Sequence, residues 1–139
     1  MTTKKFIALM LASVMLFVMS YNVSAALPED NGTVQPLWQH ATNMIVNLNL
    51  DNPVINIAVT VTGYSGTTYT NGMAILEKIE GENCGIIKTW EGITSDFAVL
   101  QFRDQTVPRE SGTYRLTFTV TTVRNGTSET ITGYRESTY

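Results

Sequence analysis

From residue 41 to the C-terminus, apolar and polar side chains alternate with a period of two. This spacing fits a β-strand, whose successive side chains point to opposite faces of a sheet, rather than a helix with its period of 3.6. Threonine, valine and isoleucine are frequent here, and β-branched residues pack well on a pleated surface. The apolar positions of the two clearest segments are Met44, Val46, Leu48 and Leu50, and Tyr114, Leu116, Phe118 and Val120. The chain beyond residue 40 is therefore predicted to be all-β.

Turn-forming residues divide this part of the chain into short strands. Asn125-Gly126 is the strongest such signal, because both residues accept the positive φ of a tight two-residue hairpin. Further turns are expected at Asp51-Asn52-Pro53 and at residues 63–66 and 80–83. Residues 73–76 are all apolar, so their strand should be buried on both sides or contain a bulge. About seven strands separated in this way predict an antiparallel immunoglobulin-like β-sandwich, with a closed barrel as the alternative.

The first 25 residues have the three zones of a secretory signal peptide. Lys4 and Lys5 supply a positive start, residues 6–19 are apolar, and residues 20–26 form a polar exit of mostly small residues. Cleavage is expected after Ala25 or Ala26. A retained anchor is the less favoured interpretation, because the apolar run is shorter than the roughly 20 residues that a spanning helix needs. The sequence therefore predicts a secreted, extracellular protein.

The expected organisation has three parts: the signal peptide over residues 1–25, a flexible leader over 26–40 and a single β-sandwich domain over 41–139. The leader is rich in acids, turn-forming residues and proline, and it shows no apolar period. The signal peptide holds two of the nine basic residues and none of the twelve acids, so the remainder carries a net charge of −5. This balance argues against nucleic acid or an anionic membrane as a partner, because both attract clustered positive charge.

The chemistry-bearing residues are few. The single cysteine, Cys84, excludes an intramolecular disulfide, so hydrophobic burial must hold the domain together. Cys84 is expected to be semi-buried in a turn and without a role, with a free thiol or an intermolecular bridge as alternatives. His40, the only histidine, is expected to be solvent-exposed or to cap a neighbouring element. A triad or a metal site would have to be built on this one ring, which offers no plausible partner.

Two pairs of acids, Glu77 with Glu80 and Asp96 with Asp104, are the candidates for a glycosidase-type carboxylate pair. Acids that are interspersed with lysine and arginine on strands more often form a solvated face that protects sheet edges. No catalytic, cofactor-binding or metal-ligating residue is therefore assigned, and no cofactor is expected.

Two surface features are candidates for recognition. Trp38, Tyr64, Tyr69 and Trp90 can form an exposed aromatic platform, although the simpler interpretation places Trp90 in the core and the tyrosines in ordinary strand or loop positions. The uncharged run 44–50 is the candidate edge strand, where replacing Leu48 with lysine should block pairing with a partner.

The segment Ser111-Gly112-Thr113-Tyr114-Arg115-Leu116 resembles the entry to strand F of an immunoglobulin-like sandwich, where a tyrosine corner ties the strand to the preceding loop. Leu116 stands where antibody domains have a cysteine. The chain as a whole, over about residues 41–134, resembles small secreted single-domain proteins of Gram-positive bacteria. The matching elements are residues 59–68, 76–78, 88–92, 112–116 and 126–130. The resemblance implies this fold and an extracellular address, and it brings no catalytic residues.

These observations favour a secreted, non-enzymatic interaction or structural module, with an unknown protein or carbohydrate at the cell surface as its partner. An extracellular hydrolase that uses a carboxylate pair is one alternative, and a membrane-active secreted protein is another. The first requires two acids in a partly buried cleft, and the second requires a large exposed apolar patch.

Overall fold

The computed structural model describes residues 37–51, 53–107 and 110–139. The predicted signal peptide, its cleavage site and most of the predicted leader lie outside the described residues. All regular elements of the described part are strands, so the all-β prediction is confirmed. The strands are β1 (Ala41–Asp51), β2 (Val54–Gly63), β3 (Thr68–Glu80), β4 (Asn83–Ser95), β5 (Val99–Thr106), β6 (Thr113–Arg124) and β7 (Thr127–Thr138).

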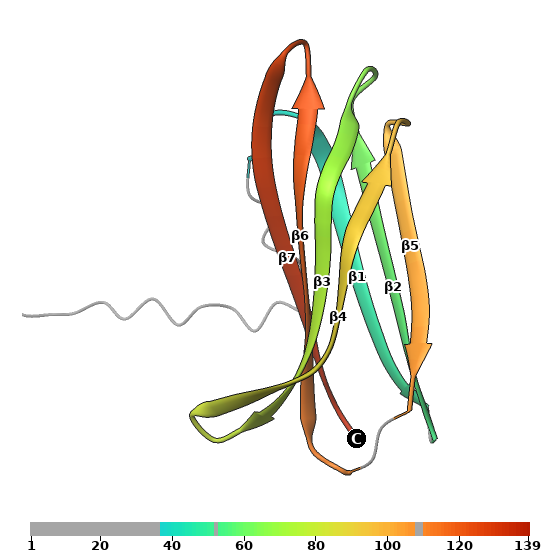
Figure 1. Ribbon diagram of the computed structural model, residues 1–139, viewed down its shortest axis with the longest axis vertical. Helices are drawn as coiled ribbons and strands as arrows, with labels where there is room; N and C mark the ends of the chain where they lie inside the picture. The colour runs from blue at the N-terminus through green and yellow to red at the C-terminus, as the bar shows by residue number, and fades with distance from the viewer. Residues whose placement is uncertain (1–36, 52, 108–109) are drawn as a thin grey trace, which may run out of the picture. The chain divides into compact units, whose positions relative to one another are not determined.

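The seven strands form two antiparallel sheets, in the orders β1-β2-β5 and β4-β3-β6-β7. The two sheets lie in separate layers (Figure 1), and no pairing among the described residues closes them into a barrel. In constant-type immunoglobulin domains the fourth strand joins the first, second and fifth. Here β4 pairs with β3 instead. The predicted seven-stranded antiparallel sandwich is therefore confirmed, with β4 in the four-stranded sheet.

The hairpins follow the turn signals. β1 pairs with β2 from Ala41↔Gly63 to Asp51↔Val54, across the break at Pro53. β6 pairs with β7 across Asn125-Gly126, whose φ angles of 51° and 76° are both positive. Glycine and asparagine adopt this backbone conformation more readily than other residues, which makes the pair a strong hairpin signal.

The bulge expected in the third strand lies just before the apolar run. The register of β3 against β6 shifts between Thr70 and Met73, and Asn71 there has a φ of 53°. Gly72 is needed at this point because a Cβ would lie 2.5 Å from the carbonyl oxygen of Ile93 on β4. Beyond the bulge the alternation resumes, with Ala74 buried in the core.

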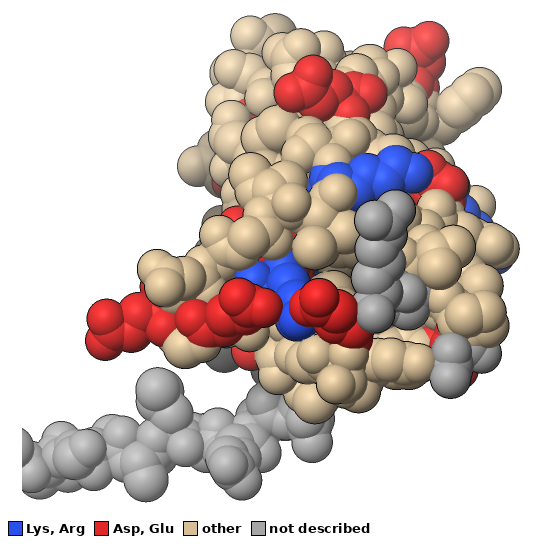
Figure 2. Space-filling view, turned by 60° about the horizontal axis from the view of Figure 1, so that its bottom comes forward, with Lys and Arg blue, Asp and Glu red and all other residues tan. Residues whose placement is uncertain are grey.

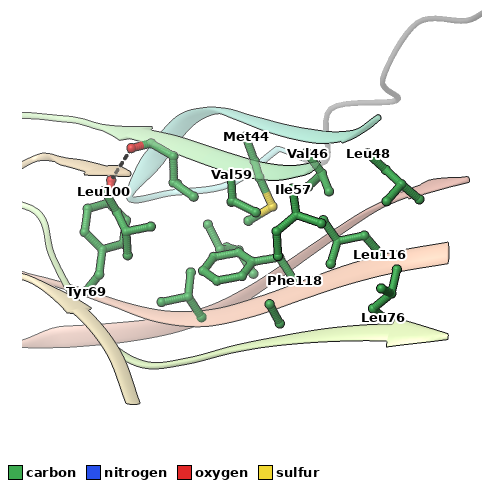
Figure 3. Close-up of a cluster of buried hydrophobic side chains, with 14 of the residues drawn as sticks. Met44, Val46, Leu48, Ile57, Val59, Tyr69, Leu76, Leu100, Leu116 and Phe118 are labelled. Carbon is green, nitrogen blue, oxygen red and sulfur yellow. Dashed lines mark hydrogen bonds between the residues drawn. The ribbon is translucent and has the colours of Figure 1, made fainter. Parts of the chain in front are cut away.

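The core lies between the two sheets and is made of their inward-facing side chains. Figure 3 shows residues of β1 and β2 on one side, with Leu116 and Phe118 of β6 meeting them from the other. Burying one such aliphatic or aromatic side chain contributes about 1.5–3 kcal/mol. The buried apolar residues are Ala41, Met44, Val46, Leu48, Ile55, Ile57, Val59, Val61, Tyr69, Ala74, Leu76, Leu100, Tyr114, Leu116, Phe118, Val120 and Ile131.

The tyrosine corner is present. Tyr114 is 2% exposed, and its hydroxyl donates to the carbonyl oxygen of Glu110 at 2.6 Å, four residues upstream. Leu116 is fully buried at the position where antibody domains have a cysteine, so aliphatic packing takes the place of the inter-sheet disulfide.

Replacing Tyr114 with phenylalanine should lower the free energy of unfolding by about 1 kcal/mol, because the ring stays buried while one hydrogen bond is lost. Urea unfolding measures this difference. Tyr134→Phe is the matched control, since the side chain of Tyr134 is 65% exposed. Equal stability of the two variants would show that the corner bond contributes nothing.

Candidate functional site

The two candidate carboxylate pairs do not form. Glu77 and Glu80 lie three residues apart on β3, and Glu80 instead pairs with Lys78 at 3.2 Å. Asp96 precedes β5 and Asp104 lies near the end of that strand, so the length of β5 separates them. Among residues 37–51, 53–107 and 110–139, no three His, Cys, Asp or Glu side chains lie together in a way that could hold a metal ion.

Several acidic and basic side chains lie side by side and form ion pairs. Lys78 contacts Glu110 at 2.5 Å as well as Glu80, and these bonds raise the pKa of the Lys78 ammonium and lower that of Glu110. Figure 2 shows red and blue atoms adjoining one another on the face in view. Cys84, expected to be semi-buried in a turn, is instead exposed at the start of β4.

His40 is buried, and the expectation of an exposed histidine is wrong. His40 is 5% exposed because residues 38–40 pack onto the domain. Trp38 contacts the core, and the backbone N–H of His40 donates a hydrogen bond to the Glu129 carboxylate at 3.1 Å. The carbonyl oxygen of His40 in turn accepts from the backbone N–H of Tyr64 and from the Thr67 hydroxyl. The residue therefore links the β2–β3 connection to β7.

Both ring nitrogens of His40 are engaged. Nδ1 lies 3.1 Å from Thr122 Oγ1 and Nε2 lies 3.0 Å from Thr127 Oγ1. Thr122 donates its only hydroxyl proton to the carbonyl of Glu129, and Thr127 donates its own to that of Arg124. Which ring nitrogen donates and which accepts depends on the tautomer of the ring. The ring is thus fully occupied by structural hydrogen bonds.

Thr122→Val should destabilise the domain by about 1–3 kcal/mol, because the substitution keeps the shape but removes the hydroxyl that bonds to the buried Nδ1 of His40 and to the part-buried carbonyl of Glu129. Thr121→Val, one residue earlier on the outward face, is the control and should change stability by less than about 0.5 kcal/mol. Thermal and urea unfolding of both variants provide the comparison. A Thr122→Val protein as stable as the control would contradict the structural role of the His40 ring.

The four aromatic residues do not form a platform. Tyr69 is 3% exposed and donates to the carbonyl of Ala98 at 2.7 Å, and burial raises the pKa of Tyr69 to about 12. Tyr64 is exposed and lies under the guanidinium of Arg124, 5.3 Å from its ring centre. Trp38 and Trp90 are half-buried against the core. The simpler interpretation of the tyrosines is therefore the correct one.

Trp90 instead closes the sandwich between β4 and β5. Its ring meets Phe102 edge to face at 6.1 Å, and its indole N–H donates to the Asp104 carboxylate, which also faces Lys88. The pKa of Asp104 lies below its usual value, because the carboxylate accepts from the backbone N–H of Gln105, from the Trp90 indole and from Lys88. This acid has a structural role in holding the two edges together.

Asp104→Asn should make the stability of the domain less dependent on acid pH. A carboxyl group whose pKa is lowered on folding stabilises the protein above its unfolded pKa, near 4, and loses that contribution as pH falls through the folded pKa. The difference in melting temperature between wild type and variant should therefore be largest above about pH 5 and shrink as pH falls below the unfolded pKa near 4. Asp96→Asn, at an exposed position, is the control. The same difference at every pH would contradict this role of the carboxylate.

The uncharged strand predicted at an edge does lie there, since β1 ends the order β1-β2-β5. Leu48, however, is 7% exposed and points into the core, so its replacement by lysine would unfold the domain rather than test the edge. Outward from β1 point Ile45, Asn47 and Asn49. Pairing of this edge with a partner strand stays a prediction.

The outer face of the three-stranded sheet contains a hollow of about 620 Å³, within the range of about 300–1,000 Å³ that is typical of small-molecule sites. Most of its lining consists of outward side chains of β1, β2 and β5. Four of these are carboxamides, one is a guanidinium and one is a methyl group. We call this surface the carboxamide hollow, formed by Asn47, Asn49, Asn56, Ala58, Arg103 and Gln105.

The strand register sets these six residues in two adjacent rows. Asn47 and Arg103 flank Ala58 in one row, because both pair with that residue from opposite sides. The second row is formed in the same way by Asn49, Asn56 and Gln105. Neighbouring strands lie about 4.8 Å apart, and the rows about 6.8 Å apart along the strand. The short side chain of Ala58 between two long ones creates the depth of the hollow.

Most of the polar groups in the hollow have no protein partner. Asn49 donates to Asp51 at 2.7 Å. Within the described residues, no hydrogen bond or ion pair engages the side chains of Asn47, Asn56, Arg103 or Gln105. Water or a ligand is therefore left to satisfy these donors and acceptors.

Sequence reasoning did not single out this surface. The available signal was asparagine, which is depleted in strands yet recurs at outward positions of β1 and β2. Within the described residues, no helix has the length and apolar character that crossing a bilayer requires. No family model matches the chain, and a search of curated proteins finds no match.

Proposed function

We propose that this protein is a secreted, non-enzymatic interaction module and that its ligand binds in the carboxamide hollow. The observation that carries the proposal is the hollow itself: a concave area on a sheet, where most of the lining polar groups have no partner within the described residues. Binding sites are concave and present a few polar groups that fix the orientation of the ligand.

Hydrogen bonds made elsewhere in the described domain also support this choice, because they engage two polar side chains that a site could otherwise use. His40 and Asp104 are both held in structural hydrogen bonds. A rigid sheet is also a good support for recognition, because side chains on strands are positioned more accurately than side chains on loops. The predicted signal peptide would deliver this surface to the outside of the cell.

Ala58→Tyr should abolish ligand binding without unfolding the domain. A tyrosine at this outward position of β2 fills the hollow, and aromatic residues are favoured in strands. The probe is an array that carries defined neutral oligosaccharides, acidic oligosaccharides and extended peptides. Wild type should bind a subset of these probes, and Ala58→Tyr should lose at least tenfold in affinity for them.

Thr132→Tyr is the matched control, because it places the same bulky ring on an exposed position of β7 in the other sheet. Circular dichroism and thermal melting establish that both variants fold. Equal binding by wild type, Ala58→Tyr and Thr132→Tyr would place the ligand elsewhere and contradict the proposal.

A further inference from the structure

We infer that the ligand of the carboxamide hollow is a neutral, hydroxyl-rich glycan; this inference rests on the proposed function above. Each carboxamide offers two N–H donors and a carbonyl acceptor, and a guanidinium offers five donors. A sugar hydroxyl both donates and accepts, so neighbouring hydroxyls can bond to the nitrogen and the oxygen of one carboxamide. Asn47, Asn56 and Gln105 have both atoms available among the described residues.

The charges around the hollow fit a neutral ligand better than an acidic one. Arg103 is the only basic residue among its lining residues, and the neighbouring Asp104 is an acid. Asp51, which accepts from Asn49, adds a second carboxylate close by. A polyanion would meet one guanidinium beside two carboxylates on a chain of net charge −3. Arg103 therefore serves as a hydrogen-bond donor rather than as part of an anion site.

The hollow also lacks what a peptide ligand would need. Peptide recognition depends on apolar or aromatic anchors that enter pockets, and no aromatic side chain is among the lining residues. The two apolar residues of the lining are Ala58, which supplies a methyl group, and Ile57, which is 3% exposed. A ligand held here must gain its affinity from hydrogen bonds along its whole surface, as a carbohydrate does.

Ala58 determines where a sugar ring fits. The ring would lie over this methyl group, with Asn47 on one side and Arg103 on the other, and its substituents would reach Asn56 in the next row. All six residues of the hollow come from one face of one sheet. An internal unit of a polymer can therefore lie in the hollow as readily as a chain end.

Native gel electrophoresis in the presence of soluble polysaccharides tests the inference with the full secreted domain. The neutral probes are xylan, mannan and a β-glucan, and the acidic probe is polygalacturonate. We expect at least one neutral polymer to retard the wild type, and Asn56→Ala to weaken that retardation about fivefold or more through the loss of its hydrogen bonds. Gln101→Ala, an exposed side chain on β5 outside the lining of the hollow, is the control and should behave as wild type.

Salt and Arg103→Gln separate the neutral ligand from an acidic one. Binding of a neutral polymer should be the same at about 0.05 M and about 0.5 M NaCl, because screening acts only between charges. Arg103→Gln should reduce it only severalfold, since glutamine still donates hydrogen bonds. Binding of polygalacturonate alone, lost in high salt and with Arg103→Gln, would overturn the inference.

The inference and the proposed function fail in different ways. If only peptides on the array bind, and Ala58→Tyr abolishes their binding, the glycan inference is wrong while the hollow remains the binding site. If no probe shows binding that depends on Ala58, both are wrong.

Discussion

The fold depends on the burial of every second side chain between two sheets that no disulfide joins. This alternation of buried and outward side chains is most complete in β2 and β6, because their inward residues are nearly inaccessible to solvent along the whole strand. Such a core tolerates no buried polar group without a partner. Within the described residues, every buried side-chain nitrogen and oxygen has one. The hydrogen bonds of His40, Tyr69 and Tyr114 all join different segments around this core, and they fix how the connections run across the ends of the strands.

Much of the fold could be predicted from the sequence, because the information is local. The period of two, the Asn125-Gly126 turn and the tyrosine corner each act within a few residues, and all three are found in the structure. The position of β4 in the sheet of β3 could not be predicted in this way. A turn signal does not by itself say which sheet the next strand joins, and the immunoglobulin-like resemblance places the fourth strand in the other sheet. In the structure β3 and β4 form a hairpin that begins at Glu80↔Asn83.

The environment of His40 and the carboxamide hollow were beyond sequence reasoning for a related reason. His40 is the last residue of the predicted leader, whose composition is typical of a flexible segment. Only the folded chain brings Thr122, Thr127 and Glu129 around it. The hollow could not be recognised either, because only the register of three strands shows that Asn47 and Arg103 lie on either side of Ala58. Outward residues on strands leave little trace in hydrophobic periodicity, since any polar side chain satisfies the pattern.

The depth of the hollow comes from the small side chain of Ala58 on β2. At this position the stability of the fold and the shape of the surface can change independently. Most larger residues at position 58 would fill the space while leaving the core intact, and several of them have a higher strand propensity than alanine. Selection for folding alone would therefore not preserve this concavity. Mutational drift would tend to flatten the sheet unless the open space itself is useful to the organism that makes the protein.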